Sequence, residues 1–220
     1  MADRWATFDC YGTLIDWNGG IRRELARLFG EDRADRLLTR YHELEPQIEV
    51  DDPAATYRTV MAQALERLAS EQGVELAPAE VDSFGRSLPG WTPFPEVPAA
   101  LEESRSRGFR LAILSNSDPD LIGASIEQIG VSFDDAITAS EIGSYKPALG
   151  HWRAFEQRHG RLPDVHVAAS LFHDVGPAND LGLPCVWVNR LGEDRGDSRP
   201  TREIVDLRPL PDALAELTSS

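Results

Sequence analysis

Short apolar segments alternate with helical patterns along most of the chain, and this alternation constrains the fold more than any other feature. The expected strands are RWATFD (4–9), FRLAILSN (109–116), DDAITAS (134–140), VHVAAS (165–170) and PCVWVN (184–189). A last short strand and a helix are expected near the end of the chain. Strands that alternate with helices predict a mainly parallel sheet with helices on both faces.

Residues 18–88 have a different texture. Apolar residues recur there at three- and four-residue spacing, and no segment is a convincing strand. We therefore predict an all-helical cap domain at 18–88, inserted after the first strand, and a core domain formed by 1–17 and 89–220. The expected fold class is α/β, a Rossmann-like parallel sheet with an inserted helical cap.

Composition excludes several classes of function. The formal net charge is −15, which argues against nucleic-acid binding because phosphates are neutralised by clustered Lys and Arg. No run of about 18 uncharged apolar residues could span a membrane, and the N-terminus does not resemble a secretion signal. The two cysteines, Cys10 and Cys185, do not indicate a disulfide framework, so a cytoplasmic protein is expected.

Polar residues stand where several predicted strands end. Asp9, Ser115 and Asn116 close two strands, Lys146 follows a third, and Asp174 follows a fourth. Each has an ordinary alternative: a turn, a helix cap or an exposed lysine. Ligands of parallel sheets bind outside the carboxyl ends of the strands, so the four positions together predict one cleft that the cap would cover.

The motifs DxYGTL, the strand ending in SN, the lysine of YKP and the late HD are similar, in this order, to those of the haloacid dehalogenase superfamily. The match spans nearly the whole chain. FDCYGTLIDW resembles the 2-haloacid dehalogenase (type II) branch, which has a helical cap. The resemblance implies an (S)-2-haloacid dehalogenase-like hydrolase that displaces halide from a short 2-haloalkanoic acid through an aspartyl ester and yields a 2-hydroxy acid.

The resemblance also implies catalytic roles. Asp9 would attack C2 of the substrate and form the ester, and Asp174 would activate the water that hydrolyses it. Lys146 would keep Asp9 ionised, since a nearby opposite charge favours the charged form. Thr13 would hold the carboxylate of the nucleophile or cap the turn, and these two roles stay open.

Further residues are expected to bind the substrate. Ser115 and Asn116 could bind its carboxylate or the departing halide. Arg40 lines up with a cap arginine of the family that has the same task, although an exposed helical arginine is the ordinary alternative. The expected partner is a small carboxylate substrate, and a homodimer is left open.

Tyr11 lies where phosphatases of the superfamily usually carry an acid that protonates the leaving alkoxide. Halide needs no proton, so the tyrosine would cost a dehalogenase nothing. Its hydroxyl, with a pKa near 10, is a poor proton donor at neutral pH. Tyr11 could also simply pack against the cap, and in either case we expect it to border the substrate.

The chain departs from the dehalogenase pattern at three positions. Trp152 replaces a tyrosine, and Ala169 and Leu171 replace a serine and an asparagine. Ser170 and His173 are the candidates to substitute for the lost polar groups. These departures leave the substrate less certain than the fold.

Two other functions are considered. The first is a Mg²⁺-dependent phosphatase acting on a small phosphate monoester, with the metal held by Asp9, the Tyr11 carbonyl and Asp174. The second is a binding protein without catalysis, which the presence of Asp9, Lys146 and Asp174 disfavours. The dehalogenase hypothesis requires no metal or other cofactor, and no zinc-ligand spacing is found.

Overall fold

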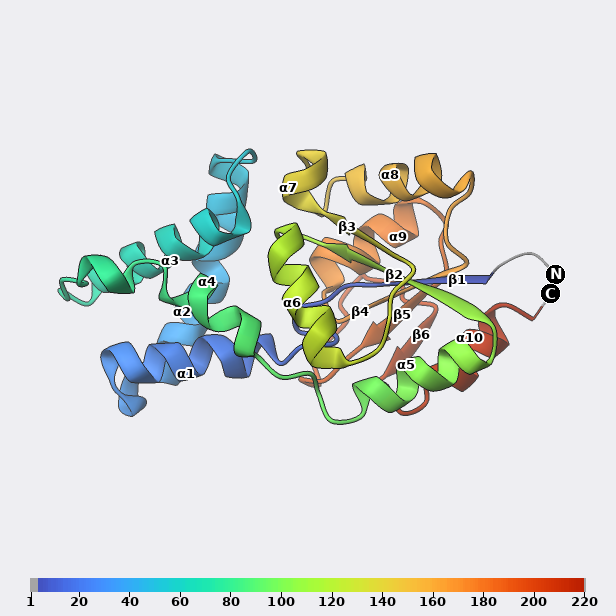
Figure 1. Cartoon of the computed structure of the whole chain (residues 1–220), viewed down its shortest axis with the longest axis horizontal. Helices are drawn as coiled ribbons and strands as arrows, with labels where there is room; N and C mark the ends of the chain where they lie inside the picture. The colour runs from blue at the N-terminus through green and yellow to red at the C-terminus, as the bar shows by residue number, and fades with distance from the viewer. Residues whose placement is uncertain (1–3, 220) are drawn as a thin grey trace.

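The computed structural model describes residues 4–219, which contain a six-stranded sheet (Figure 1). Its strands are β1 Arg4–Phe8, β2 Phe109–Ser115, β3 Asp135–Thr138, β4 Val165–Ala168, β5 Cys185–Val188 and β6 Arg202–Ile204. Their order is β3-β2-β1-β4-β5-β6, and all neighbouring strands are parallel. The predicted parallel sheet is confirmed, with β1 between β2 and β4.

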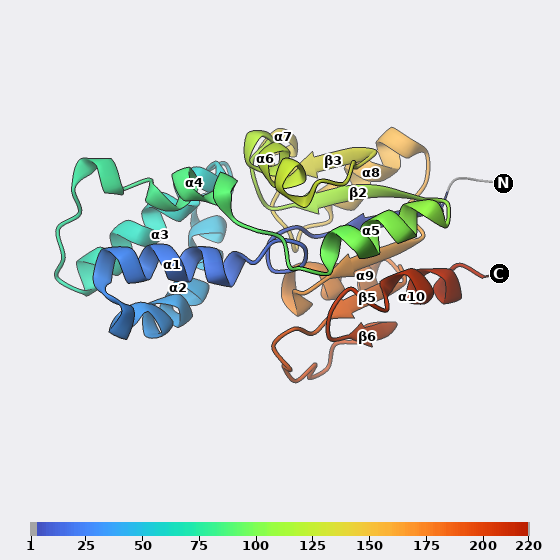
Figure 2. The ribbon, with the colours of Figure 1, turned by 60° about the horizontal axis from the view of Figure 1, so that its bottom comes forward.

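Helices cover both faces of the sheet, so the strands are buried on both sides (Figure 2). These helices are α5 Val97–Ser106, α6 Pro119–Ile129, α7 Ala139–Ile142, α8 Gly150–His159, a π-helical turn Leu171–Val175 that leads into α9 Gly176–Asp180, and α10 Leu210–Leu217. Alternate residues of β1 serve the two faces. The Trp5 ring packs edge-on against Phe155 of α8, whereas Phe8 belongs to the core cluster that includes Leu101 of α5.

The segment between β1 and β2 is helical and contains no strand within the described residues, as predicted. Apart from α5, which packs on the sheet, it consists of α1 Trp17–Phe29, α2 Glu31–Asp51, α3 Tyr57–Glu71, α4 Ser83–Ser87 and two 3-10 turns, Pro78–Glu80 and Leu88–Gly90. Residues 78–90 form the first 3-10 turn, α4 and the second 3-10 turn in succession, and Pro78 and Pro89 each lie in the first turn of a 3-10 segment. Nowhere in residues 4–219 is a helix both long and apolar enough to cross a membrane.

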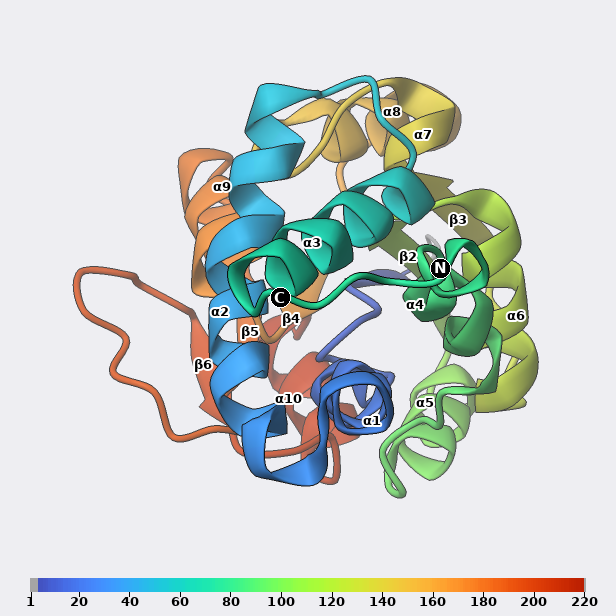
Figure 3. The ribbon, with the colours of Figure 1, turned by 90° about the vertical axis from the view of Figure 1, so that its left-hand side faces the viewer.

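The helical insertion lies beyond the carboxyl ends of the strands (Figure 1). Figure 3 views the molecule from that side, with α1, α2 and α3 in front of the sheet. Asp16 begins α1 by accepting a hydrogen bond from Gly19 N at 3.0 Å, and Thr56 begins α3 by accepting one from Thr59 N at 3.2 Å. The insertion therefore starts a few residues after Asp9 and faces the predicted cleft.

Candidate active site

Asp9 follows β1 directly and is held by its neighbours. Its backbone N–H donates to Val167 O at 3.0 Å, which aligns it with β4. Thr13 Oγ1 donates to Asp9 Oδ2 at 2.8 Å and accepts from Ala169 N at 2.9 Å. Gly12 has φ +87°, a conformation that favours glycine and lets the chain turn back here. The structure thus gives Thr13 the first of its two expected roles, since it holds the carboxylate.

Lys146 connects the two acids. Its Nζ lies 2.9 Å from Asp9 Oδ1 and 2.7 Å from Asp174 Oδ1, and it donates to Leu114 O at 2.9 Å. The side chain is 2% exposed. Burial by itself would lower the pKa of Lys146, but the charges of Asp174 and Asp9 outweigh it and raise that pKa above the usual value. Lys146 is therefore a permanent cation between two carboxylates.

Asp174 has a second partner that the sequence analysis missed. His166 of β4 is fully buried; its Nε2 lies 2.9 Å from Asp174 Oδ1 and its Nδ1 2.9 Å from Thr7 Oγ1. Burial tends to raise the pKa of Asp174, yet Lys146 and His166 together lower it well below the usual range. Asp174 Oδ2 is buried and has no hydrogen-bond partner among the described residues. A histidine within an otherwise apolar strand was the available signal.

Ser115 and Asn116 both line the cavity, but they differ in what they contact. The Asn116 side chain accepts from Lys146 N at 2.6 Å and donates to Lys146 O at 3.0 Å, so its amide fixes the backbone of the lysine. The Ser115 hydroxyl forms no hydrogen bond with any described residue. Ser115 is therefore the one of the two whose side chain is free for a ligand.

Tyr11 lines the cavity, but its hydroxyl points away from Asp9. The hydroxyl lies 3.1 Å from Ser125 Oγ of α6. Its ring is stacked on that of Tyr57, with centroids 6.0 Å apart. Burial raises the pKa of Tyr11 well above its usual value, which makes the phenol a still weaker acid. Tyr11 therefore forms a wall of the cavity, and its hydroxyl is engaged by Ser125 of α6.

Ser170 and His173 also border the cavity. Ser170 Oγ accepts from His173 N at 3.1 Å and lies 3.1 Å from His173 Nδ1, so it caps the turn that carries Asp174. His173 Nε2 lies 3.9 Å from Glu49 Oε2 of α2, across the boundary between core and insertion. Burial lowers the pKa of His173, which favours its neutral form.

Arg40 does not reach the cavity, contrary to expectation. Its guanidinium binds Glu71 and Glu43 on the outside of the insertion, at 2.7 Å in each case. Helix α2 turns about 100° per residue, so Arg40 lies roughly 140° from Glu45 and 180° from Glu49, which do line the cavity. The arginine is therefore on the wrong side of its helix for the predicted role.

The three residues at which the chain departs from the dehalogenase pattern have packing or backbone contacts. Trp152 is fully buried and packs edge-on against His166, with centroids 5.3 Å apart. The backbone of Ala169 contacts Thr13 and also accepts from Trp187 Nε1 at 2.9 Å. Leu171 packs against the apolar cluster beneath the sheet. None of the three side chains supplies a polar group to the cavity.

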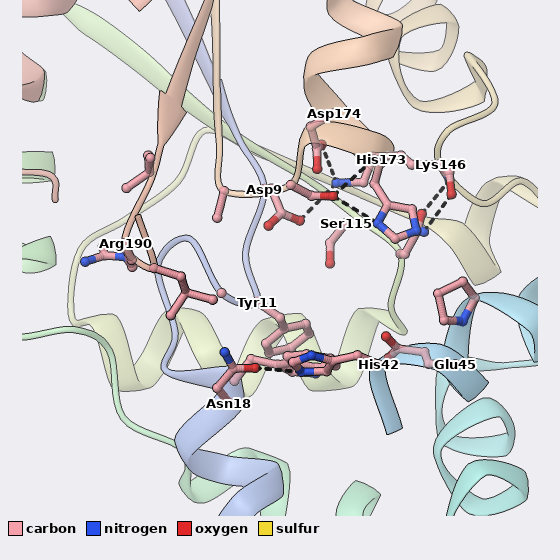
Figure 4. Close-up of a pocket in the computed structure, with 18 of the residues that line it drawn as sticks. Asp9, Tyr11, Asn18, His42, Glu45, Ser115, Lys146, His173, Asp174 and Arg190 are labelled. Atoms are coloured by element: carbon pink, nitrogen blue, oxygen red, sulfur yellow. Dashed lines mark hydrogen bonds and ion pairs between the residues drawn. The ribbon is translucent and has the colours of Figure 1, made fainter. Parts of the chain in front are cut away.

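The cavity has a volume of about 470 Å³ and lies between the core and the insertion. Figure 4 shows Asp9, Lys146 and Asp174 on one side and Asn18, His42 and Glu45 on the other. The insertion side is acidic: His42, Glu45, Pro46 and Glu49 of α2 line it. This acidic wall was not predicted from the sequence.

Arg190, in the loop after β5, was also missed. Its guanidinium lies 2.7 Å from Glu96 Oε1, donates to Thr13 O at 2.9 Å and stacks on the Phe94 ring, 3.6 Å from its centroid. Arg190 follows directly after a predicted strand, much as Asp9 closes one, and this position could have indicated a residue near the cleft. The Arg190 charge is already balanced by Glu96.

The side chains around Asp9 do not fit a divalent metal as they lie. Lys146 binds Oδ1 of both acids and Thr13 binds Asp9 Oδ2, so Asp174 Oδ2 is the one carboxylate oxygen of the two acids without a hydrogen-bond partner among the described residues. Mg²⁺ and Ca²⁺ need about six or more oxygen ligands, several of which can be water. Within residues 4–219, no group of three or more His, Cys, Asp and Glu side chains is arranged to hold a metal ion.

Comparison with known proteins gives a consistent result. The family model of haloacid dehalogenase-like hydrolases matches residues 4–201. The (S)-2-haloacid dehalogenase of Pseudomonas sp. (strain YL) is 29% identical over 91% of this chain and 90% of its own. A phosphoserine phosphatase of Thermus thermophilus is 32% identical over 68% of this chain and 61% of its own.

Solved structures agree on the fold. The L-2-haloacid dehalogenase from Xanthobacter autotrophicus matches with a TM-score of 0.84 and covers 97% of this chain and 98% of its own, at 20% identity. The residues that the family model matches include Asp9, Lys146 and Asp174, which the fold brings together. This chain belongs to the haloacid dehalogenase-like hydrolases.

Proposed function

We propose that the protein is a 2-haloacid dehalogenase that converts a short 2-haloalkanoic acid into a 2-hydroxy acid. An oxygen of Asp9 attacks C2, and a carbon–oxygen bond forms while the halide leaves with the bonding electron pair. Asp174 then takes a proton from water as the water oxygen attacks the Asp9 carboxyl carbon. The ester bond to that carbon breaks and the departing alkoxide oxygen takes the proton from Asp174, which gives the hydroxy acid. The second proton of the water is released to solvent as the Asp9 carboxylate re-forms.

The orientation of Tyr11 carries this proposal. Its hydroxyl is bound to Ser125, so no acid is available two residues after the nucleophile to protonate a leaving group. Halide is a stable anion and leaves without a proton, whereas an alkoxide needs one. A site without a proton donor at this position therefore favours a reaction with a halide leaving group.

The remaining groups match the two steps. Lys146 lies against the Asp9 carboxylate and orients it in a site where Asp9 is only 8% exposed. Asp174 has its Oδ1 occupied and its Oδ2 unpartnered, which leaves one oxygen for a water molecule. The Ser115 hydroxyl is the proposed contact for the substrate carboxylate. The insertion, for which we propose a cap domain at residues 18–88, encloses the reaction.

Sequence relatives support this assignment, since (S)-2-haloacid dehalogenases match over most of the chain at 25–29% identity. The cytoplasm is the proposed compartment, because Cys10 and Cys185 are both buried and unpaired. A Mg²⁺-dependent phosphatase is the alternative. The phosphoserine phosphatase match and the free Asp174 Oδ2 favour it, whereas the donor set around Asp9 does not.

One assay separates the two. Halide release is measured from a panel of 2-chloro- and 2-bromoalkanoic acids, with and without EDTA, beside p-nitrophenyl phosphate as phosphatase substrate. Halide release that survives EDTA supports the dehalogenase. Phosphate release that disappears in EDTA and returns with Mg²⁺, without any halide release, would replace it by the phosphatase.

A further inference from the structure

Two acids dominate the wall of the cavity opposite Asp9. Glu45 and Glu49 lie one turn apart on α2, are 9% and 7% exposed, and both line the cavity. Among the described residues, neither forms an ion pair with a lysine or an arginine. Glu49 Oε2 accepts from Asn116 Nδ2 at 3.4 Å and lies 3.9 Å from His173 Nε2. Desolvation of a lone charge is costly, so burial raises the pKa of both acids and they hold protons more tightly than free carboxyls do; an ammonium ion bound beside them would let them ionise.

The surroundings of Glu45 are built for a hydrogen-bond acceptor. Tyr57 OH donates to Glu45 Oε1 at 2.7 Å and Tyr41 OH donates to the same oxygen at 3.3 Å. Trp17 Nε1 in turn donates to Tyr57 OH at 2.9 Å, which polarises that hydroxyl toward the acid. All of these donors converge on Oε1, so Oε2 of Glu45 has no partner among the described residues.

Among the described residues that line the cavity, no lysine or arginine pairs directly with the two acids. Lys146 is shared by Asp9 and Asp174, and Arg190 is paired with Glu96. On the core side, the Ser115 hydroxyl and Asp174 Oδ2 also lack partners, although both residues are only 1% exposed and line the same cavity. Unpartnered groups therefore face the cavity from both of its sides.

The size of the cavity indicates a ligand that reaches both sides. Its volume of about 470 Å³ falls in the range of roughly 300–1,000 Å³ typical of sites for drug-sized ligands. A three-carbon haloacid on Asp9 would leave most of this space empty. The rings of Trp17 and Tyr57 line the space beside Glu45, and aromatic rings attract cations.

We infer that Glu45 and Glu49 bind a positively charged amine at the end of the substrate remote from the reacting carbon. The substrate class is then a 2-haloacid with an amine-bearing chain, whose acid end meets Ser115 and whose amine end meets α2. That the substrate is a 2-haloacid rests on the proposed function, whereas the amine site rests on the residues that line the cavity. The amine supplies the positive charge that the acidic pair lacks.

Binding of small probes tests the amine site without turnover. Calorimetry compares n-butylammonium with butanoate, which has similar length and opposite charge. The wild-type protein should bind n-butylammonium at least tenfold more tightly. Glu45→Gln and Glu49→Gln should each weaken this binding about ten- to a hundredfold, as expected for a hydrogen bond between charged groups. Glu43→Gln, on the outer side of the same helix, is the matched control and should change nothing.

Circular dichroism and thermal melting of each variant show whether it is folded. Equal or tighter binding of butanoate, or n-butylammonium binding that survives both substitutions in folded protein, would overturn the inference. The substrate class is tested with 2-bromo-5-(trimethylammonio)pentanoate and its neutral isostere 2-bromo-6,6-dimethylheptanoate. The charged compound should have at least tenfold higher kcat/KM. If neither releases bromide while n-butylammonium still binds, the dehalogenase proposal fails and the amine site stands.

Discussion

His166 Nε2 lies 2.9 Å from Asp174 Oδ1, beneath the cavity and with both side chains buried. The contact fixes Oδ1 of Asp174. Because the carboxyl group is planar, it also limits where the free Oδ2 can lie. Lys146 binds the fixed oxygen too, so the free Oδ2 owes its position to two neighbours. His166 is therefore a positioning residue for the acid that we assign to ester hydrolysis.

His166→Gln should slow ester hydrolysis and spare ester formation. A hydrogen bond to a charged group is worth about 1.5–3 kcal/mol, so steady-state kcat should fall about tenfold or more. The first-turnover burst of halide should persist, because Asp9 keeps Lys146 and Thr13. Rapid-quench measurement separates the two phases. His159→Gln, at a histidine that pairs with Asp135 away from the cavity, is the control. A loss of the burst together with kcat would assign His166 to the first step instead.

The acidic wall should make the protein less stable as pH rises. Burial raises the pKa of Glu49 to about 9 and that of Glu45 to about 7, against an unfolded value near 4.3. Between these values the folded protein holds protons that the unfolded chain has released, so the free energy of unfolding falls with pH. This stability is complete below about pH 4.3 and is lost as pH rises through 7 and 9.

Glu49→Gln should flatten this dependence. Removing one such proton reduces the slope by at most about 1.4 kcal/mol per pH unit, and the variant should be more stable than wild type at pH 9. Urea denaturation at pH 6, 7, 8 and 9 measures the free energy of unfolding of both proteins, with Glu43→Gln for comparison. Parallel curves for wild type and Glu49→Gln would show that Glu49 is ionised in the folded protein.

Other groups also face Glu45 and Glu49 from the surrounding elements. They are Tyr41, Tyr57, Asp9, Asn116, Lys146 and His173.

Arg40→Gln should leave catalysis almost unchanged. The side chain is bound to Glu43 and Glu71 on the outer surface of the insertion. Exposed ion pairs contribute about 0–1 kcal/mol, so the free energy of unfolding should change by no more than that. Steady-state kinetics on the best haloacid of the panel should give kcat/KM within twofold of wild type. A large rise in KM would mean that Arg40 swings into the cavity when substrate binds.

The fold could be predicted because its signals are local. The apolar runs that end at Phe8, Ser115 and Ala168 are strands in the structure, and helical periodicity identified the insertion. Parallel strand ends must meet, so Asp9, Lys146 and Asp174 come together as the order of motifs implied. The predicted third strand is shorter than expected because α7 begins at Ala139.

The cap side of the site could not be predicted in the same way. Which face of α2 meets the core depends on how the whole insertion packs, and an alignment to a cap arginine does not fix that rotation. A signal was nevertheless present: Glu45 and Glu49 stand on the apolar side of α2, beside Tyr41, Leu44 and Ile48. Acids within an apolar stripe indicate a polar site that the stripe encloses.

The two acids of the proposed mechanism should fail at different steps. Asp9→Asn should abolish halide release, including any first-turnover burst, because no ester can form. Asp174→Asn should slow turnover strongly yet still allow up to one halide per active site, and the protein should gain the mass of the substrate's carboxyalkyl group. Burst kinetics and intact-protein mass spectrometry measure both outcomes. The neutral amide of the Asp174→Asn variant also leaves Lys146 with one anionic partner instead of two, so melting curves must accompany the kinetics.

Isotope labelling decides whether Asp9 is the nucleophile at all. In the second step water attacks the Asp9 carboxyl carbon, so a single turnover in H₂¹⁸O should place the label in Asp9 and leave the first hydroxy acid unlabelled. Mass spectrometry of the Asp9 peptide and of the product locates it. Label in the hydroxy acid of the first turnover would mean that water attacks C2 directly, and Asp9 would then act as a base.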